Sequence, residues 1–420
     1  MSKYLVLSTF DNPAGGQGYF LYKDLLEHGE EAFFLPLIRQ YSDHDHFFIN
    51  ARGKYSLRRI WYALLIRLQR CLLFKKSADY HSFFNLLMRG KSAKAILGRT
   101  PFVPDVIVIG WCDGYVSSKT ISELYHQTHA RIIKPMVDAF MLGGGCHYPC
   151  HQYESGCLHC PALRFPFLAR KEFNYRLRYL KDVPFSLVGS GFDMERANKC
   201  LFLQNKKKIK SVGVPSIPFT MDKDTARQNF GIPSEHFVIL FGAVDVTSKR
   251  KGFDVLFQSL ELLSDKVSAE RPVTLLVAGL LNQDISLPGL HIVSPGLLSL
   301  NDLYKAYYAA DVFVSPSLED SGPYMVNYSI ACGRPVISFR IGIALDLVIP
   351  GETGYIAQYN DPNDLCRGLI LFSEMSRTEL NEYQNRCLSL MEAYRKKDSQ
   401  MFDRIFRSCK QPILTYCKKK

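Results

Sequence analysis

The stretch that decides the fold is residues 309–336, which read AADVFVSPSLEDSGPYMVNYSIACGRPV. Residues 312–315 form a largely apolar run, as in strands that a parallel sheet buries on both faces. Two acidic residues and a turn of small residues follow, and a helical pattern begins near Tyr324. Open parallel sheets bind ligands beyond the carboxyl ends of their strands, where helices begin with unpaired N–H groups. The stretch therefore predicts an anion-binding turn between a buried strand and a helix.

This turn offers both kinds of group that a sugar diphosphate needs. Its backbone amides would hold the diphosphate, and a carboxylate just before them would accept hydrogen bonds from sugar hydroxyls. The alternative is that the two acids only cap the helix. Asp320 is the candidate catalytic carboxylate, and the candidate donor-binding residues are Glu319, Ser321, Gly322, Pro323, Tyr324 and Met325.

A basic turn precedes this stretch in the chain. The predicted strand 237–244 leads through Asp245 into Lys249-Arg250-Lys251-Gly252, just before a helical segment. Alone, such a triplet is typical of a solvated loop. Beside an acid-and-amide turn it would reach the same phosphates through charge-assisted contacts. Arg250 and Lys251 are therefore candidate catalytic cations.

Strand-like and helix-like segments alternate through all 420 residues, which predicts an α/β protein with parallel sheets covered by helices. This length suits two domains. A polar, proline-bearing break after Lys206-Lys207-Lys208 places the boundary near residue 214. We expect domains at 1–214 and 215–376 and a helical, charged segment at 377–420. The strands expected after 237–244 are 273–279, 290–293, 312–315, 335–339 and 353–357, and those expected in the first half are 4–8, 33–37, 106–111, 132–137 and 185–188.

The first expected strand ends in a glycine-rich turn that contains Gly15 and Gly16. Glycine lets a backbone approach a ligand without a clash at Cβ, so both are candidate donor-binding residues. A purely structural turn explains them equally well.

The motifs of the second half form an ordered series that resembles the fourth family of retaining glycosyltransferases. The matching motifs are Lys251-Gly252, Ala278-Gly279, AADVFVSPS at 309–317, ACGRPV at 331–336 and GETG at 351–354. The resemblance implies the GT-B fold, in which two Rossmann-like domains face each other across a cleft. It also implies a nucleotide-sugar donor on the second domain, an acceptor on the first and no obligatory cofactor.

Two positions depart from the family pattern. The family has two glutamates separated by seven residues, and counting back from Cys332-Gly333 those places hold Asp320 and Tyr328. Tyr328 remains a donor-binding candidate, although its side chain offers no charged contact to ribose. A His-Asp pair usual in the first domain reads Val137-Asp138 here, so only Asp138 carries over as a catalytic candidate.

A Cys-rich insert at 143–161 resembles that of family members which assemble bacterial cell-surface polysaccharide. Four cysteines within fifteen residues, ending in C-x-x-C, could hold a structural zinc, and free thiols are the alternative. The candidate ligands are Cys146, Cys150, Cys157 and Cys160.

The net charge of +12 favours anionic partners. The apolar stretch 60–74 contains Arg67 and Arg70 and is shorter than a bilayer span needs. It is either an interfacial helix on an anionic membrane or a core helix with a solvated basic face. Residues 1–8 lack the pattern of a secretory signal, so we expect a cytoplasmic enzyme, and one at the inner face of the membrane if the stretch 60–74 is an interfacial helix.

These observations predict a glycosyltransferase that moves a sugar from a nucleotide-sugar donor to a glycan or lipid-linked acceptor in surface polysaccharide synthesis. The substitutions at Tyr328 and Val137 motivate one alternative, a nucleotide-sugar-binding protein without transferase activity. A nucleotide-sugar epimerase is disfavoured because its characteristic acid and histidine set is not seen. Nucleic-acid binding is not expected, because no recognisable binding module accompanies the charge.

Overall fold

The computed structural model describes residues 2–11, 17–39, 57–75, 90–148, 151–266, 271–281, 285–320, 322 and 324–402. The chain divides into two compact units. Unit 1 comprises Met1–Gly189 and Asp193–Lys210, and unit 2 comprises Ser190–Phe192 and Ser211–Met401. The division at Lys210 lies close to the boundary expected at 214.

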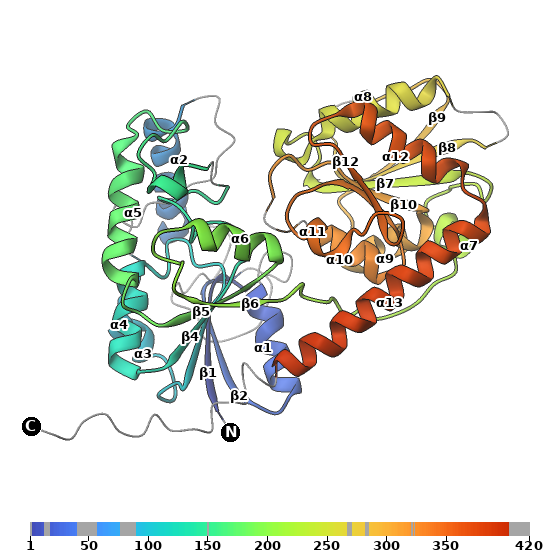
Figure 1. Cartoon of the computed structure of the whole chain (residues 1–420). Helices are drawn as coiled ribbons and strands as arrows, with labels where there is room; N and C mark the ends of the chain where they lie inside the picture. Colours follow the sequence, from blue (N-terminus) through green and yellow to red (C-terminus); the bar gives the residue numbers. More distant parts are fainter. Residues whose placement is uncertain are drawn as a thin grey trace, which may run out of the picture. The chain divides into compact units, whose positions relative to one another are not determined.

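Unit 1 is built on a parallel sheet in the order β2-β1-β3-β4-β5-β6. A hydrophobic cluster that includes Leu5, Ile107 and Phe173 fills its interior. The strands are β1 Lys3–Phe10, β2 Glu31–Ile38, β3 Val106–Ile109, β4 Arg131–Pro135, β5 Phe185–Gly189 and β6 Lys207–Lys210. The helices are α1 Gln17–Glu27, α2 Leu57–Leu73, α3 Ala93–Leu97, α4 Ser118–Thr128, α5 Phe167–Leu180 and α6 Gly191–Lys199, with the 3-10 turn η1 His151–Ser155 (Figure 1).

Unit 2 repeats the architecture with the parallel order β12-β11-β10-β7-β8-β9. Its strands are β7 Phe237–Asp245, β8 Val273–Leu280, β9 Leu290–Gly296, β10 Val312–Ser315, β11 Val336–Phe339 and β12 Gly354–Ala357. Its helices are α7 Lys223–Gln228, α8 Phe253–Ser264, α9 Leu300–Ala309, α10 Tyr324–Ala331, α11 Ala344–Leu347, α12 Pro362–Glu374 and α13 Arg377–Phe402, with the turn η2 Lys249–Lys251. The predicted pair of Rossmann-like domains is confirmed.

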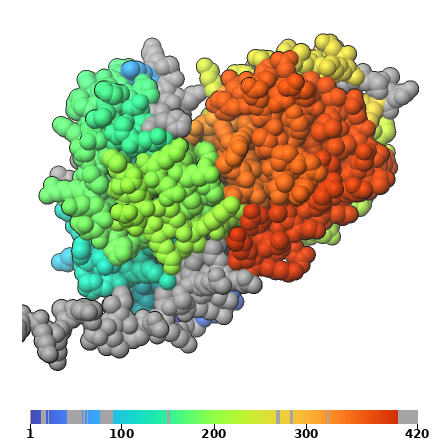
Figure 2. All heavy atoms as spheres, in the orientation of Figure 1, coloured from blue at the N-terminus to red at the C-terminus, as the bar shows by residue number. Residues whose placement is uncertain are grey.

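The sheet of unit 2 is buried on both faces because alternate side chains of its strands enter different cores. On β7, Val238 and Leu240 join the cluster beneath α9 and α10, whereas Ile239 and Phe241 join the cluster beneath α8 and α12. Helix α13 packs on the first of these clusters through Cys387 and Met391. Helices α12 and α13 form much of the surface of unit 2 that is red in Figure 2.

Strand β6 corrects one expectation from the sequence. The lysines at 206–208 indicated a polar break, but Lys207–Lys210 pairs with β5 as the last strand of the sheet. An edge strand needs no apolar face, and charged side chains protect it from pairing with other chains.

Candidate functional site

The first candidate site lies where the strand order of unit 2 changes direction. Strands β7 and β10 are neighbours in the sheet, yet α8, β8, β9 and α9 separate them in the chain. The loops after these two strands therefore leave side by side from the carboxyl edge. Such a switch point is where open parallel sheets bind ligands.

Gly252 brings the basic turn after β7 against the loop after β10. It adopts a left-handed backbone with φ of 70°, and a Cβ here would lie 1.8 Å from the Pro316 carbonyl oxygen. The amide of Leu318 donates to the Arg250 carbonyl at 2.8 Å, which fixes the two loops to each other. Only glycine permits this approach, so the Lys251-Gly252 motif has a physical reason.

The two loops place two cations on one carboxylate. Lys251 Nζ lies 2.6 Å and Arg250 Nη1 3.3 Å from Asp320 Oδ2. Asp320 is 8% exposed, so these contacts are largely shielded from water. The structure thus gathers the three catalytic candidates of the second half, and the cluster carries one net positive charge.

The start of α10 adds backbone donors to this cluster. The Gly322 amide donates to Asp320 Oδ1 at 3.3 Å. Met325, in the first turn of α10, packs so close to Gly242 that a Cβ there would lie 2.6 Å from Met325 Cε. Ser321 and Pro323 lie outside the described residues, and Glu319 is half-buried beside them.

Tyr359 belongs to the same region but was not predicted from the sequence. Its hydroxyl donates to the Leu318 carbonyl at 3.2 Å, and burial followed by the charge of Glu319 raises its pKa. It follows β12, far from the motifs in the sequence, so no local pattern pointed to it.

Tyr328 lies in the core of unit 2. Its ring packs against Tyr324, Tyr304 and Tyr307 with centroid separations of 5.1, 5.5 and 6.4 Å. Burial, followed by the nearby Tyr304, raises its pKa. The position that holds a glutamate in the family is here part of an aromatic cluster.

The second candidate site lies at the switch point of unit 1, between β1 and β3. The Thr9 amide donates to the Trp111 carbonyl at 2.6 Å, and the Thr9 hydroxyl donates to the Asp113 carbonyl at 2.9 Å. These bonds hold Asp113 at the carboxyl edge, where its side chain is 15% exposed. Gly15 and Gly16, expected nearby, lie outside the described residues.

His147 joins Asp113 to Asp138, the catalytic candidate that follows β4. Its Nε2 lies 2.5 Å from Asp113 Oδ2, and its Nδ1 bonds Asp138 Oδ2. Its ring is sandwiched between Trp111 and Phe140, at centroid distances of 4.5 and 5.0 Å. Both nitrogens thus face carboxylates, and the aromatic faces favour a cation between them.

These contacts change the protonation of both partners. Burial lowers the pKa of His147, but the charges of Asp138 and Asp113 outweigh it and raise the pKa to about 10. Burial also opposes ionisation of Asp138, yet the His147 charge keeps the pKa of that carboxyl below its usual value. A raised pKa favours the imidazolium form of His147 at neutral pH, which suits its position between the two carboxylates.

His147 contacts Asp138 from nine residues away in the sequence. Position 137 is valine, so the sequence indicated that a His-Asp pair was lost. His147 lies within the Cys-rich insert 143–161, where no motif marks it as a partner of Asp138. The spacing differs from the family pattern, and only the fold brings the two side chains together.

The cysteine insert is described in part. Cys157 is buried, and its Sγ accepts a bond from the Gly144 amide at 3.1 Å. Among the described residues, no group of three His, Cys, Asp or Glu side chains is arranged to hold a metal ion. Cys150 lies outside those residues, so the zinc site with Cys146, Cys157 and Cys160 stays a prediction.

Comparisons with known proteins match part of unit 2 to one family. Residues 235–373 match the family described as Glycosyl transferases group 1. A D-inositol 3-phosphate glycosyltransferase of Streptosporangium roseum is 28% identical over 164 residues, which cover 36% of this chain and 37% of that protein. The match thus spans little more than a third of that relative's length.

Solved structures match over nearly the whole chain. Sucrose-phosphate synthase from Thermosynechococcus elongatus shares 15% identity with a TM-score of 0.61, covering 97% of this chain and 100% of that one. Anabaena HepE, solved in complex with UDP and glucose, shares 12% identity with a TM-score of 0.56, covering 96% and 98%. These similarities show that the two parallel sheets form a GT-B fold.

Proposed function

We propose that this chain, whose second unit is a group 1 glycosyltransferase domain within a GT-B fold, is a retaining glycosyltransferase. It transfers a sugar from a nucleotide-sugar donor to a glycan or lipid-linked acceptor. The observation that carries the proposal is the cluster of Arg250, Lys251 and Asp320 at the switch point of unit 2. UDP-sugars are the first donors to test, because HepE was solved with UDP and glucose.

The charge of this cluster suits the departure of a nucleoside diphosphate. Glycosyl transfer passes through an oxocarbenium-like state while negative charge grows on the leaving group. Lys251, Arg250 and the amides at the start of α10 would stabilise that charge more in the transition state than in the bound donor. Asp320 holds both cations in place and offers its carboxylate to the sugar hydroxyls.

The cluster at the carboxyl edge of unit 1 suits an acceptor hydroxyl. Asp113 and Asp138 share the His147 imidazolium, and the charge of the buried Lys134 also acts on Asp138, while Asp113 remains partly exposed. A carboxylate at that edge accepts a hydrogen bond from a hydroxyl and repels phosphate. We assign Asp113 to the acceptor and Asp138 and His147 to positioning.

Lys251→Met tests the donor site. It removes a charge-assisted contact to the departing diphosphate, so we expect kcat/KM for a UDP-sugar to fall by about 10²-fold, as for a loss of about 3 kcal/mol. Lys249→Met, in the same turn, is the matched control and should retain activity. Equal activity of the two variants would contradict the assignment.

An assay for UDP release also distinguishes the proposed enzyme from a protein that only binds nucleotide sugars. Such a protein is stabilised against thermal unfolding by the donor but neither hydrolyses nor transfers it. Release of UDP from pure protein, abolished in Lys251→Met, supports the enzyme. Donor binding without any release would favour the binding protein.

Helix α2 supports a membrane-associated acceptor. On α2, Gln69 is buried, and so is Phe74, which directly follows the helix. A stripe of large apolar side chains at helical spacing is exposed by half or more. The stripe consists of Leu57, Ile60, Trp61, Leu64, Leu68 and Leu72. These exposed side chains favour the interfacial helix over the core helix of the two alternatives. Large exposed apolar patches on a protein surface mark interaction sites.

Charge complementarity favours an anionic lipid surface as the partner of α2. Arg67 and Arg70 are exposed on the same helix, which has no acidic residue. We propose that α2 lies in the interface at the inner face of a membrane and presents unit 1 to a lipid-linked acceptor of surface-polysaccharide assembly. In the described part of the chain, no helix is long and apolar enough to span a bilayer.

Vesicle sedimentation tests this docking. Binding to anionic vesicles should exceed binding to neutral ones and weaken with salt, since each basic residue near the surface contributes about 1 kcal/mol. Arg67→Glu/Arg70→Glu should abolish it, whereas the charge-matched Lys94→Glu/Lys181→Glu variant should not. Equal loss in both variants would mean that net charge alone drives binding.

A further inference from the structure

A cavity lies at the opposite edge of the unit 2 sheet from the donor loops. It measures about 360 Å³, and its polar lining comes from Ser216, Thr220, Tyr308, Arg334, Gln384 and Arg395. Arg334 directly precedes β11 and Tyr308 lies near the end of α9, so the cavity is at the amino ends of the strands. Asp320, by contrast, follows the carboxyl end of β10. The two sites are therefore separate.

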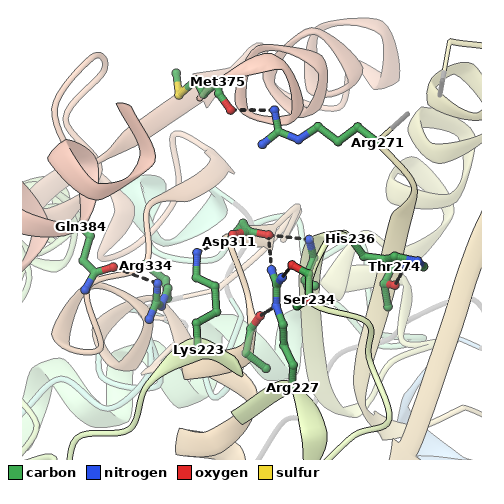
Figure 3. A network of polar contacts seen from close by, with 12 residues as sticks. Lys223, Arg227, Ser234, His236, Arg271, Thr274, Asp311, Arg334, Met375 and Gln384 are labelled. Atoms are coloured by element: carbon green, nitrogen blue, oxygen red, sulfur yellow. Dashed lines mark hydrogen bonds and ion pairs between the residues drawn. The ribbon is translucent and has the colours of Figure 1, made fainter. Parts of the chain in front are cut away.

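Figure 3 shows a group of cations near Asp311, and one of them, Arg334, lines this cavity. Asp311 accepts bonds from Lys223 Nζ at 2.6 Å on one oxygen and from Arg227 Nη2 at 2.8 Å on the other. The Val238 amide adds a third bond at 2.7 Å. The carboxylate of Asp311 is thus fully engaged, and it is 6% exposed.

Arg334 adds a further positive charge to this group. Its side chain is 4% exposed and donates to Gln384 Oε1 at 3.1 Å. Burial lowers the pKa of Arg334, while Asp311 opposes that change. Within the described part of the chain, the buried Nε of Arg334 meets no acceptor.

These cations are not balanced by the carboxylate that they surround. Lys223, Arg227 and Arg334 oppose Asp311 alone in this group, which leaves two positive charges in a largely buried place. None of the described residues that line the cavity is acidic, and Arg395 adds another cation to its wall. Buried charge without a counter-charge is costly, so the arrangement favours an anion.

We propose that this cavity binds a small dianion of the phosphate-monoester class, with its phosphoryl group on Arg334 and Arg395. A dianion offsets the two excess charges, and arginine matches phosphate oxygens with its fork of donors. Ser216 and Thr220 offer hydroxyls to the rest of the ligand, and Phe219 and Leu388 cover its apolar parts. The volume is at the lower end of ligand pockets, so the ligand is small.

Binding of inorganic phosphate to the full chain, followed by calorimetry at constant ionic strength, tests the proposal. We expect one saturable site beyond any binding at the donor loops. Lys251→Met shows how much of the measured phosphate binding occurs at the donor loops, and it should leave binding at this cavity unchanged. Arg395→Met, an exposed position on α13, should weaken it by about tenfold or more, as for the loss of one charge-assisted contact.

Two further arms complete the test. Lys396→Met removes a neighbouring charge that does not line the cavity and should bind phosphate like the wild type. Arg334→Gln should abolish phosphate binding. If this substitution at a buried position prevents folding, the exposed Arg395→Met variant still tests the proposal. Phosphate affinity unchanged in Arg395→Met, or malonate bound as tightly as phosphate, would overturn the proposal.

Discussion

Unit 1 should lose stability at alkaline pH because His147 gives up its charge there. In the folded protein the pKa of His147 is about 10, whereas the ordinary value is 6.5. Between these values the folded state holds a proton that the unfolded state does not. The stabilisation is complete below about pH 6.5 and declines by about 1.4 kcal/mol for each pH unit until the folded group titrates. Over the whole range the loss amounts to about 5 kcal/mol.

The variant His147→Gln isolates this contribution. It removes the imidazolium from between Asp113 and Asp138, so it should be several kcal/mol less stable than the wild type at pH 6.5. The difference between the two proteins should shrink as the pH rises toward 9. Titrating groups that do not contact His147 are common to both proteins and cancel in the difference.

Trp111 provides the probe for this measurement. The chain has two tryptophans, and Trp61→Phe leaves Trp111, which stacks directly on the imidazole, as the reporter. Urea unfolding followed by its fluorescence at a series of pH values gives the free energies of unfolding. His159→Gln, an exposed histidine of the same unit, is the control. A wild-type to His147→Gln difference that stays constant from pH 6.5 to 9 would refute the charged clamp.

Two further predictions concern the glycine at the donor turn and the cysteine insert. Gly252→Ala should lower the melting temperature much more than Gly351→Ala. Both glycines have positive φ, but only Gly252 abuts the Pro316 carbonyl. Similar losses of melting temperature for the two variants in calorimetry would contradict the packing argument. Protein purified without added metal should contain one zinc per chain on elemental analysis if the four cysteines bind it, and replacing Cys160 with serine should release it. Metal-free protein with an intact fold would end that hypothesis.

The sequence predicted the fold of unit 2 well because its strands are buried on both faces. The continuous apolar runs at 237–244 and 312–315 need no partner to be recognised, and both are strands in the structure. Strand β6 was missed for the opposite reason, because an exposed edge strand rich in lysine lacks an apolar signal. Burial, rather than strand pairing, is what the sequence reveals.

Some residues of the candidate sites could be predicted from the sequence and others could not, for a similar reason. Arg250, Lys251 and Asp320 stand in short motifs next to strand ends, so strand positions alone were enough to bring them together. His147 meets Asp113 and Asp138 through an irregular segment whose path no local pattern specifies. Arg334 belonged to a recognised motif, but its contact with Gln384 on α13 joins residues fifty positions apart, which no local pattern predicts.

The charges at the two switch points favour different substrate groups, which gives the fold a division of labour. Two cations on Asp320 leave a positive site in unit 2, which attracts a diphosphate and stabilises it further as it departs. In unit 1, the His147 imidazolium and the buried Lys134 together balance Asp113 and Asp138, so this site has no excess positive charge for a diphosphate and offers Asp113 to a neutral hydroxyl. The donor therefore has an electrostatic reason to bind unit 2. Since the His147 imidazolium contributes to this balance, losing its proton at alkaline pH would leave the site negative and make it repel phosphate.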